Sequence, residues 1–108
     1  MTVGEAAVKL GLKTFSLTDD SREITGAYIG DLLSWVMGRA KSGDAWITIM
    51  SNVNIAAVAA LADTACIILA EGVTLDENVI EVAKNKDINI LGSEEPAYEI
   101  AVKLSQLI

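Results

Sequence analysis

Hydrophobic residues follow two different patterns along the second half of this chain. Short, nearly continuous apolar runs occupy residues 45–50, 65–70 and 88–91, whereas other segments space their apolar side chains three and four positions apart. The first pattern is typical of strands buried on both faces, and the second is typical of helices with an apolar face. The spacing predicts helices over residues 32–40, 55–63, 74–83 and 93–107.

The first third of the chain carries shorter signals of the same kind. Thr2 and Glu5 have the spacing of a capping box, and Gly11 is placed to end the helix that this box begins. Asp31 follows a turn and is a candidate N-cap for the helix after it. Two short strands are predicted over residues 12–17 and 24–29.

Two later sites also carry helix-start signals. Residues 74–77 repeat the capping-box pattern. Ser93 is predicted to cap the last helix, with Glu94, Glu95 and Pro96 in its first turn.

Strands and helices alternate with short connections, which implies right-handed βαβ units. The predicted fold class is therefore α/β, a three-layer α/β/α arrangement with a mainly parallel sheet. No linker, internal repeat or low-complexity segment divides the chain, so residues 1–108 are predicted to be a single domain.

Charge and composition narrow the classes of partner. Fifteen acidic against eight basic residues give a net charge of -7, and no basic cluster occurs. Nucleic-acid and anionic-membrane binding normally require a cationic face, so neither partner is expected. No apolar run approaches the roughly 20 residues of a membrane span, and the N-terminus lacks the basic start of a signal peptide. With the single Cys66, these features favour a cytoplasmic protein.

The chain lacks the usual catalytic equipment. It has no His, no P-loop, no GxGxxG run and no GxSxG elbow. Cys66 lies in an aliphatic strand and is expected to be a buried hydrophobe. We therefore expect no catalytic residue, no metal and no cofactor. An enzyme that uses Asp31 or Glu71 as a general base is the least favoured alternative.

Ligands of parallel α/β sheets bind outside the carboxyl ends of the strands. Residues 51–54, 71–72 and 92–93 are expected there, and the first of these loops offers a hydroxyl, two side-chain amides and a helix N-terminus. That set suits a small anionic or nucleotide-like ligand. A purely structural alternative is that Ser51 and Asn54 only cap the helix. The candidate ligand-binding residues are Ser51, Asn52, Asn54, Glu71, Gly72 and Asp31.

Several stretches resemble the DRTGG domain family. The resemblance rests on residues 30–37, 46–49 and 54–59, and on the strand 66–69 followed by Glu71 and Gly72. The pentapeptide that names the family does not occur. The resemblance implies a fold like the N-terminal domain of HPr kinase/phosphorylase, and a regulatory role such as that of DRTGG domains found beside CBS pairs. The kinase chemistry of that enzyme resides in a separate P-loop domain, which is absent here.

These observations predict a non-catalytic regulatory or ligand-sensing module that acts as a homodimer. Its ligand is expected to be a small anion or nucleotide, or alternatively a protein partner. The second hypothesis is an interaction subunit without a ligand. Its dimer would bury apolar side chains such as Trp35, Met37 or Trp46.

Overall fold

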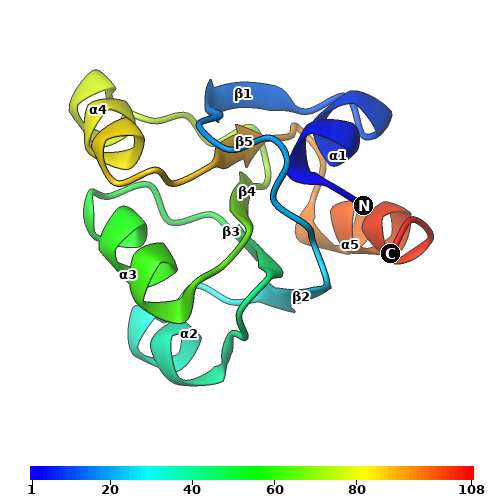
Figure 1. The fold of residues 1–108 in the computed structure, drawn as a ribbon, viewed down its shortest axis with the longest axis horizontal. Helices are drawn as coiled ribbons and strands as arrows, with labels where there is room; N and C mark the ends of the chain where they lie inside the picture. The colour runs from blue at the N-terminus through cyan, green and yellow to red at the C-terminus, as the bar shows by residue number, and fades with distance from the viewer.

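The computed structural model describes all 108 residues as one five-stranded sheet with helices on both faces (Figure 1). This arrangement confirms the α/β fold class predicted from the sequence. None of the helices combines the length and apolar character that a bilayer span requires. The strands are β1 (Lys13–Ser16), β2 (Gly26–Ile29), β3 (Asp44–Thr48), β4 (Cys66–Leu69) and β5 (Ile90–Gly92), and the helices are α1 (Val3–Lys9), α2 (Leu33–Arg39), α3 (Asn54–Ala62), α4 (Glu77–Asn85) and α5 (Ala97–Ser105).

The sheet has the strand order β1-β5-β4-β3-β2. Strands β2 to β5 are parallel neighbours, whereas β1 pairs with β5 in the antiparallel direction. The chain steps from β2 to β5 in one direction, so crossovers of one hand place α2, α3 and α4 on the same face. Helices α1 and α5 lie on the opposite face, as Figure 1 shows.

Two hydrophobic cores form because successive strand residues point to opposite faces. Trp46, Ile67 and Ile90 pack on the face of α2, α3 and α4. The residues that alternate with them along the strands, such as Ile47 and Ile68, pack under α1 and α5. Cys66 is buried in this second core, and burial raises the pKa of its thiol to about 12. The thiol is therefore protonated at neutral pH, as expected for a structural cysteine.

The two tryptophans have different environments. Trp46 is fully buried, and its Nε1 donates a hydrogen bond of 2.8 Å to the carbonyl oxygen of Gly30. The hypothesis that Trp46 lies on an exposed dimer surface is therefore wrong, because its indole fills the core beneath α2 and α3. Trp35 and Met37 are exposed, and the guanidinium of Arg39 stacks 3.7 Å from the centroid of the Trp35 ring.

The capping box of α1 is confirmed. The Thr2 hydroxyl accepts from the backbone N–H of Glu5 at 3.1 Å, and the Glu5 carboxylate accepts from the N–H of Thr2 at 3.0 Å. These hydrogen bonds lower the pKa of the Glu5 carboxyl. Gly11, at φ +62°, follows the end of this helix as predicted.

The last two helices begin later than the sequence predicted. Helix α4 begins at Glu77 after Asp76, whose side chain makes no capping hydrogen bond, so residues 74–77 do not form a capping box. Helix α5 begins at Ala97 with Pro96 as its N-cap residue, so Glu94 and Glu95 precede the helix. Ahead of these helices, the loops after β4 and β5 hydrogen-bond with each other through their backbones.

Candidate ligand-binding site

The connections that leave β4 and β5 diverge to opposite faces of the sheet. The chain after β4 enters α4, which packs on the face of Trp46, whereas the chain after β5 enters α5 on the other face. Where neighbouring parallel strands send their connections in opposite directions, a crevice opens outside their carboxyl ends. The topology therefore marks the β4–β5 edge as the place for a ligand.

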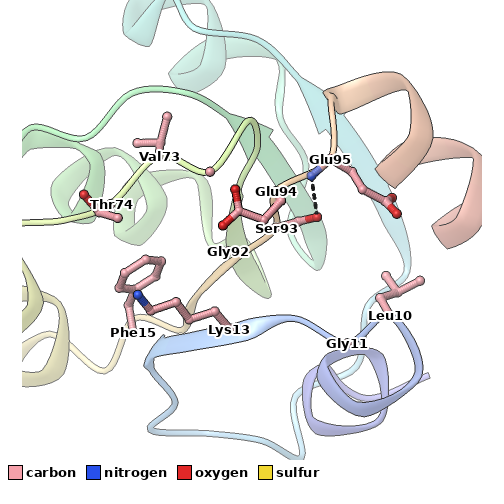
Figure 2. A pocket seen from close by; sticks show the side chains of 11 residues that line it. Leu10, Gly11, Lys13, Phe15, Val73, Thr74, Gly92, Ser93, Glu94 and Glu95 are labelled. Atoms are coloured by element: carbon pink, nitrogen blue, oxygen red, sulfur yellow. Dashed lines mark hydrogen bonds between the residues drawn. The ribbon is translucent and has the colours of Figure 1, made fainter.

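Backbone hydrogen bonds fix the two loops at this edge. The N–H of Glu71 donates to the Glu95 carbonyl and the N–H of Gly72 donates to the Ser93 carbonyl, each at 2.9 Å. The Ser93 hydroxyl accepts from the N–H of Glu95 at 3.0 Å, the bond drawn in Figure 2. The sequence prediction that Ser93 caps α5 is therefore wrong, because its hydroxyl closes a turn ahead of that helix.

The crevice contains a hollow of about 270 Å³, lined by residues 10, 11, 13, 15, 72–74 and 92–95 and here called the switch-point pocket. Glycines form part of its wall because side chains approach their backbone closely. A Cβ on Gly92 would lie 2.7 Å from Cε2 of Phe15. Gly72 has φ +71°, and a Cβ there would collide with the Glu94 carboxylate. Side chains at either glycine would displace the groups that shape the pocket.

Charged groups of both signs reach the switch-point pocket. Figure 2 shows Lys13 and Phe15 on the wall formed by β1, and Glu94 on the facing wall after β5. The Lys13 ammonium lies 4.9 Å from the centroid of the Phe15 ring, a cation–π distance. Glu95 pairs with Lys103, whereas Lys13 and Glu94 belong to none of the three ion pairs of the chain. One ammonium and one carboxylate thus remain available to a ligand.

Comparison with known families decides where this chain belongs. The model of the DRTGG domain matches residues 16–107, which is most of the chain. The chain belongs to the DRTGG domain family. No curated protein matches it in sequence.

A solved structure shares the DRTGG fold. It is the crystal structure of the CBS and DRTGG domains of the regulatory region of Clostridium perfringens pyrophosphatase, complexed with its activator, diadenosine tetraphosphate. The TM-score is 0.75 at 13% sequence identity, and the likeness covers 94% of this chain. This chain spans 44% of that structure's chain, so the two share the fold of one part of that region.

The DRTGG match covers one wall of the switch-point pocket and not the other. The loops after β4 and β5 lie inside residues 16–107, whereas Lys13 and Phe15 precede the match.

Gly72 is the one predicted ligand-binding residue that lines the switch-point pocket of this DRTGG domain. Glu71 is its neighbour, at φ +62°, with an exposed side chain. The remaining four lie at the carboxyl ends of β2 and β3 and line none of the four hollows in the structure: Asp31, Ser51, Asn52 and Asn54. The structure thus places Gly72 at the switch-point pocket with Glu71 next to it in the chain, and the other four predicted residues outside this pocket.

The Asp31 carboxylate links the segment after β2 to the end of β3 rather than capping a helix. Its Oδ1 accepts from the Thr48 hydroxyl at 2.8 Å and from the N–H of Ile49 at 3.1 Å. The predicted N-cap role is wrong, because α2 begins one residue later with Leu32 as its N-cap. Asp31 and Glu71 line no common pocket, so nothing brings them together as catalytic carboxylates.

The loop over residues 51–54 is closed by Asn52. Its Oδ1 accepts from the backbone N–H of Asn54 at 2.9 Å, an Asx turn at the start of α3. Asn54 is the first residue of the helix, and the N-cap residue is Val53. The alternative interpretation of the sequence was that Ser51 and Asn54 only cap α3. In the structure, Asn52 makes the side-chain hydrogen bond at the start of this helix instead.

Sequence reasoning missed Lys13, Phe15 and Glu94 as pocket residues. The third strand-end loop, at residues 92–93, was identified correctly, and Glu94 is its next residue. The alternation over residues 12–17 predicted a strand but carried no information on its partner or direction. Lys13 reaches the pocket because β1 runs antiparallel to β5, which places the start of β1 beside Gly92.

The other hollows lack this arrangement. The largest, about 810 Å³, is an open depression between α1 and residues 12–21, and none of its lining residues follows a parallel strand. A third, of about 390 Å³, lies at the amino ends of β2 and β3. No group of three or more His, Cys, Asp or Glu side chains is placed to hold a metal ion. The switch-point pocket is therefore the candidate site.

Proposed function

We propose that this DRTGG domain is a non-catalytic regulatory module that binds a small nucleotide-like ligand in the switch-point pocket. The observation that carries the proposal is the placement of an unpaired Lys13 and an unpaired Glu94 on facing walls of a pocket at the β4–β5 edge. The structural neighbour is a regulatory region complexed with a nucleotide activator, which supports the choice of ligand class. We propose that residues 1–108 act as one domain, in the cytoplasm.

A thermal-shift screen of the full chain tests the ligand. Adenosine nucleotides, diadenosine tetraphosphate and acyl phosphates are the probes, and we expect at least one nucleotide to raise the melting temperature. Thr74→Trp puts a large side chain at the rim of the pocket and should abolish that shift. Asn54→Ala alters the loop over 51–54 and should leave it intact. Loss of the shift in Asn54→Ala but not in Thr74→Trp would indicate that the ligand binds at the loop over residues 51–54 instead.

We further propose that the domain is a homodimer joined through its β2 edge. Strand β2 ends the sheet, so its outer backbone groups have no strand partner. Exposed apolar side chains occur on β2 and on the segment that follows it: Ile29, Leu32, Trp35 and Met37. Exposed apolar side chains near an open strand are typical of a self-complementary interface.

Light scattering tests the dimer. We expect a dimer for the unmodified chain and a monomer for Trp35→Glu, which replaces an exposed apolar side chain with a carboxylate. Val8→Glu is the matched control, because Val8 is 82% exposed on α1 and lies away from β2. A monomeric unmodified chain would refute the dimer and leave the ligand proposal untouched. A dimer without any ligand response would favour the pure interaction subunit.

A further inference from the structure

A second hollow adjoins the switch-point pocket across Phe15. It has a volume of about 320 Å³ and lies between β1 and α4, so we call it the α4-side hollow. Lys13, Phe15 and Thr74 line both cavities and form the ridge between them. The α4-side hollow adds Lys84, from the last turn of α4, to the groups around this ridge.

The sizes of the two cavities indicate that one ligand would use both. Pockets for small molecules usually measure about 300–1,000 Å³. The switch-point pocket, at about 270 Å³, is below this range, and the α4-side hollow, at about 320 Å³, is at its lower limit. A ligand that crosses the ridge would have adequate room, whereas a ligand confined to either side would not be well enclosed.

The two sides of the ridge differ in charge. The α4-side hollow is lined by the ammonium-bearing Lys13 and Lys84, neither of which forms an ion pair in a chain with almost twice as many acids as bases. Its carboxylate, Glu77, begins α4 seven residues before Lys84, which is about 10 Å along the helix axis. The Lys84 end therefore attracts an anion.

The switch-point side offers an acceptor instead. The Glu94 side chain makes no hydrogen bond or ion pair within the chain, and its carboxylate packs against Gly72 at the pocket wall. A carboxylate in this position suits the hydroxyl groups of a ribose, because an ionised carboxylate can only accept hydrogen bonds. The Lys13 ammonium sits on the ridge over Phe15, within reach of either side.

From this distribution we infer that the ligand is a nucleoside phosphate bound across Phe15. Its ribose hydroxyls donate to Glu94 in the switch-point pocket, and its phosphate is held between Lys13 and Lys84 in the α4-side hollow. The inference rests on the proposed function and specifies the orientation of the ligand in that site.

Titration calorimetry of the full chain with adenosine, AMP and inorganic phosphate tests the inference. We expect AMP to bind about tenfold more tightly than adenosine, because the phosphate gains charge-assisted hydrogen bonds. Lys84→Met should reduce AMP affinity to the level of adenosine without changing adenosine binding. Lys86→Met is the matched control, because Lys86 lies just beyond α4 and lines neither cavity. Glu94→Gln should weaken AMP and adenosine alike.

The outcomes separate the inference from the proposed function. Equal affinities for AMP and adenosine, or equal effects of Lys84→Met and Lys86→Met, would overturn the inference while leaving a nucleotide site in place. Loss of AMP affinity with rising salt in the unmodified chain, but not in Lys84→Met, would support it. If none of the three probes binds and no nucleotide shifts the melting temperature, both the inference and the proposed function fail.

Discussion

The side-chain amide of Asn89 donates a hydrogen bond of 2.7 Å to the carbonyl oxygen of Asp19, a residue 70 positions earlier in the chain. Asn89 also donates to Ala65 O at 3.1 Å, and its Oδ1 accepts from the N–H groups of Thr18 and Asp19 at 3.0 Å. All four hydrogen-bonding positions of a buried amide are thus used. Asn89 joins the loop after β1 to the parallel sheet.

This network predicts that Asn89→Asp destabilises the fold by about 2–4 kcal/mol, because a buried carboxylate oxygen would face two carbonyl oxygens. Urea unfolding measures the free energy. Asn78→Asp is the matched control, since Asn78 is exposed in the first turn of α4, where a carboxylate is tolerated. Equal stability of the two variants would contradict the role given to Asn89.

Asp31 is predicted to matter for stability and not for ligand binding. Asp31→Ala removes the acceptor for Thr48 Oγ1 and Ile49 N, which should cost about 1–2 kcal/mol of unfolding free energy. Asp31→Asn keeps an acceptor oxygen and should cost less. Ligand titration of both variants should match the unmodified chain. A loss of ligand affinity with unchanged stability would instead show that Asp31 contributes to ligand binding.

Gly72→Ala is predicted to lower stability by about 1–3 kcal/mol, because the residue has φ +71° and its new Cβ would meet the Glu94 carboxylate. Adding Glu94→Ala removes the collision and should recover part of the loss, leaving the backbone strain. Gly38→Ala is the control of opposite sign, because a Cβ in this position of α2 meets no atom within 4 Å. It should stabilise the helix by about 0.5–1 kcal/mol. Thermal and urea unfolding measure all four chains.

The carboxyl group of Asp63 should make stability depend on pH. Hydrogen bonds from Ser42 and Arg22 lower its pKa from the ordinary 3.8. A lowered folded-state pKa contributes stability above the unfolded value, which is lost as the pH falls through the folded value. Asp63→Asn should therefore melt earlier than the unmodified chain at pH 6, and the difference should shrink as the pH falls below 3.8.

Asparagine suits this comparison because it tolerates the left-handed backbone of Asp63, at φ +57°. The measurement is the melting temperature of both chains from pH 7 to pH 2. A difference that stays constant across this range would show that the lost contribution is not ionic.

Local patterns in the sequence determined most of the elements of this protein. The apolar runs that became β3 and β4 are buried on both faces, and the spacing of Thr2 and Glu5 produced the capping box found in the structure. These predictions succeed because the hydrophobic pattern of a strand and the capping of a helix are set by residues only a few positions apart. Helix starts at Asp31 and Ser93 were mispredicted because the Asp31 carboxylate accepts hydrogen bonds from the end of β3 and the Ser93 hydroxyl closes a turn ahead of α5.

Only the tertiary structure decided which residues face the loops after β4 and β5 across the candidate site. Nothing near residues 12–17 specifies that β1 pairs with β5, 74 or more residues later, or that it runs antiparallel to it. That pairing brings Lys13 and Phe15 to the carboxyl ends of β4 and β5, and the divergence of α4 and α5 to opposite faces opens the crevice beside them. Strand partners and helix faces follow from how the whole chain buries its apolar surface, so they are absent from any short segment of sequence.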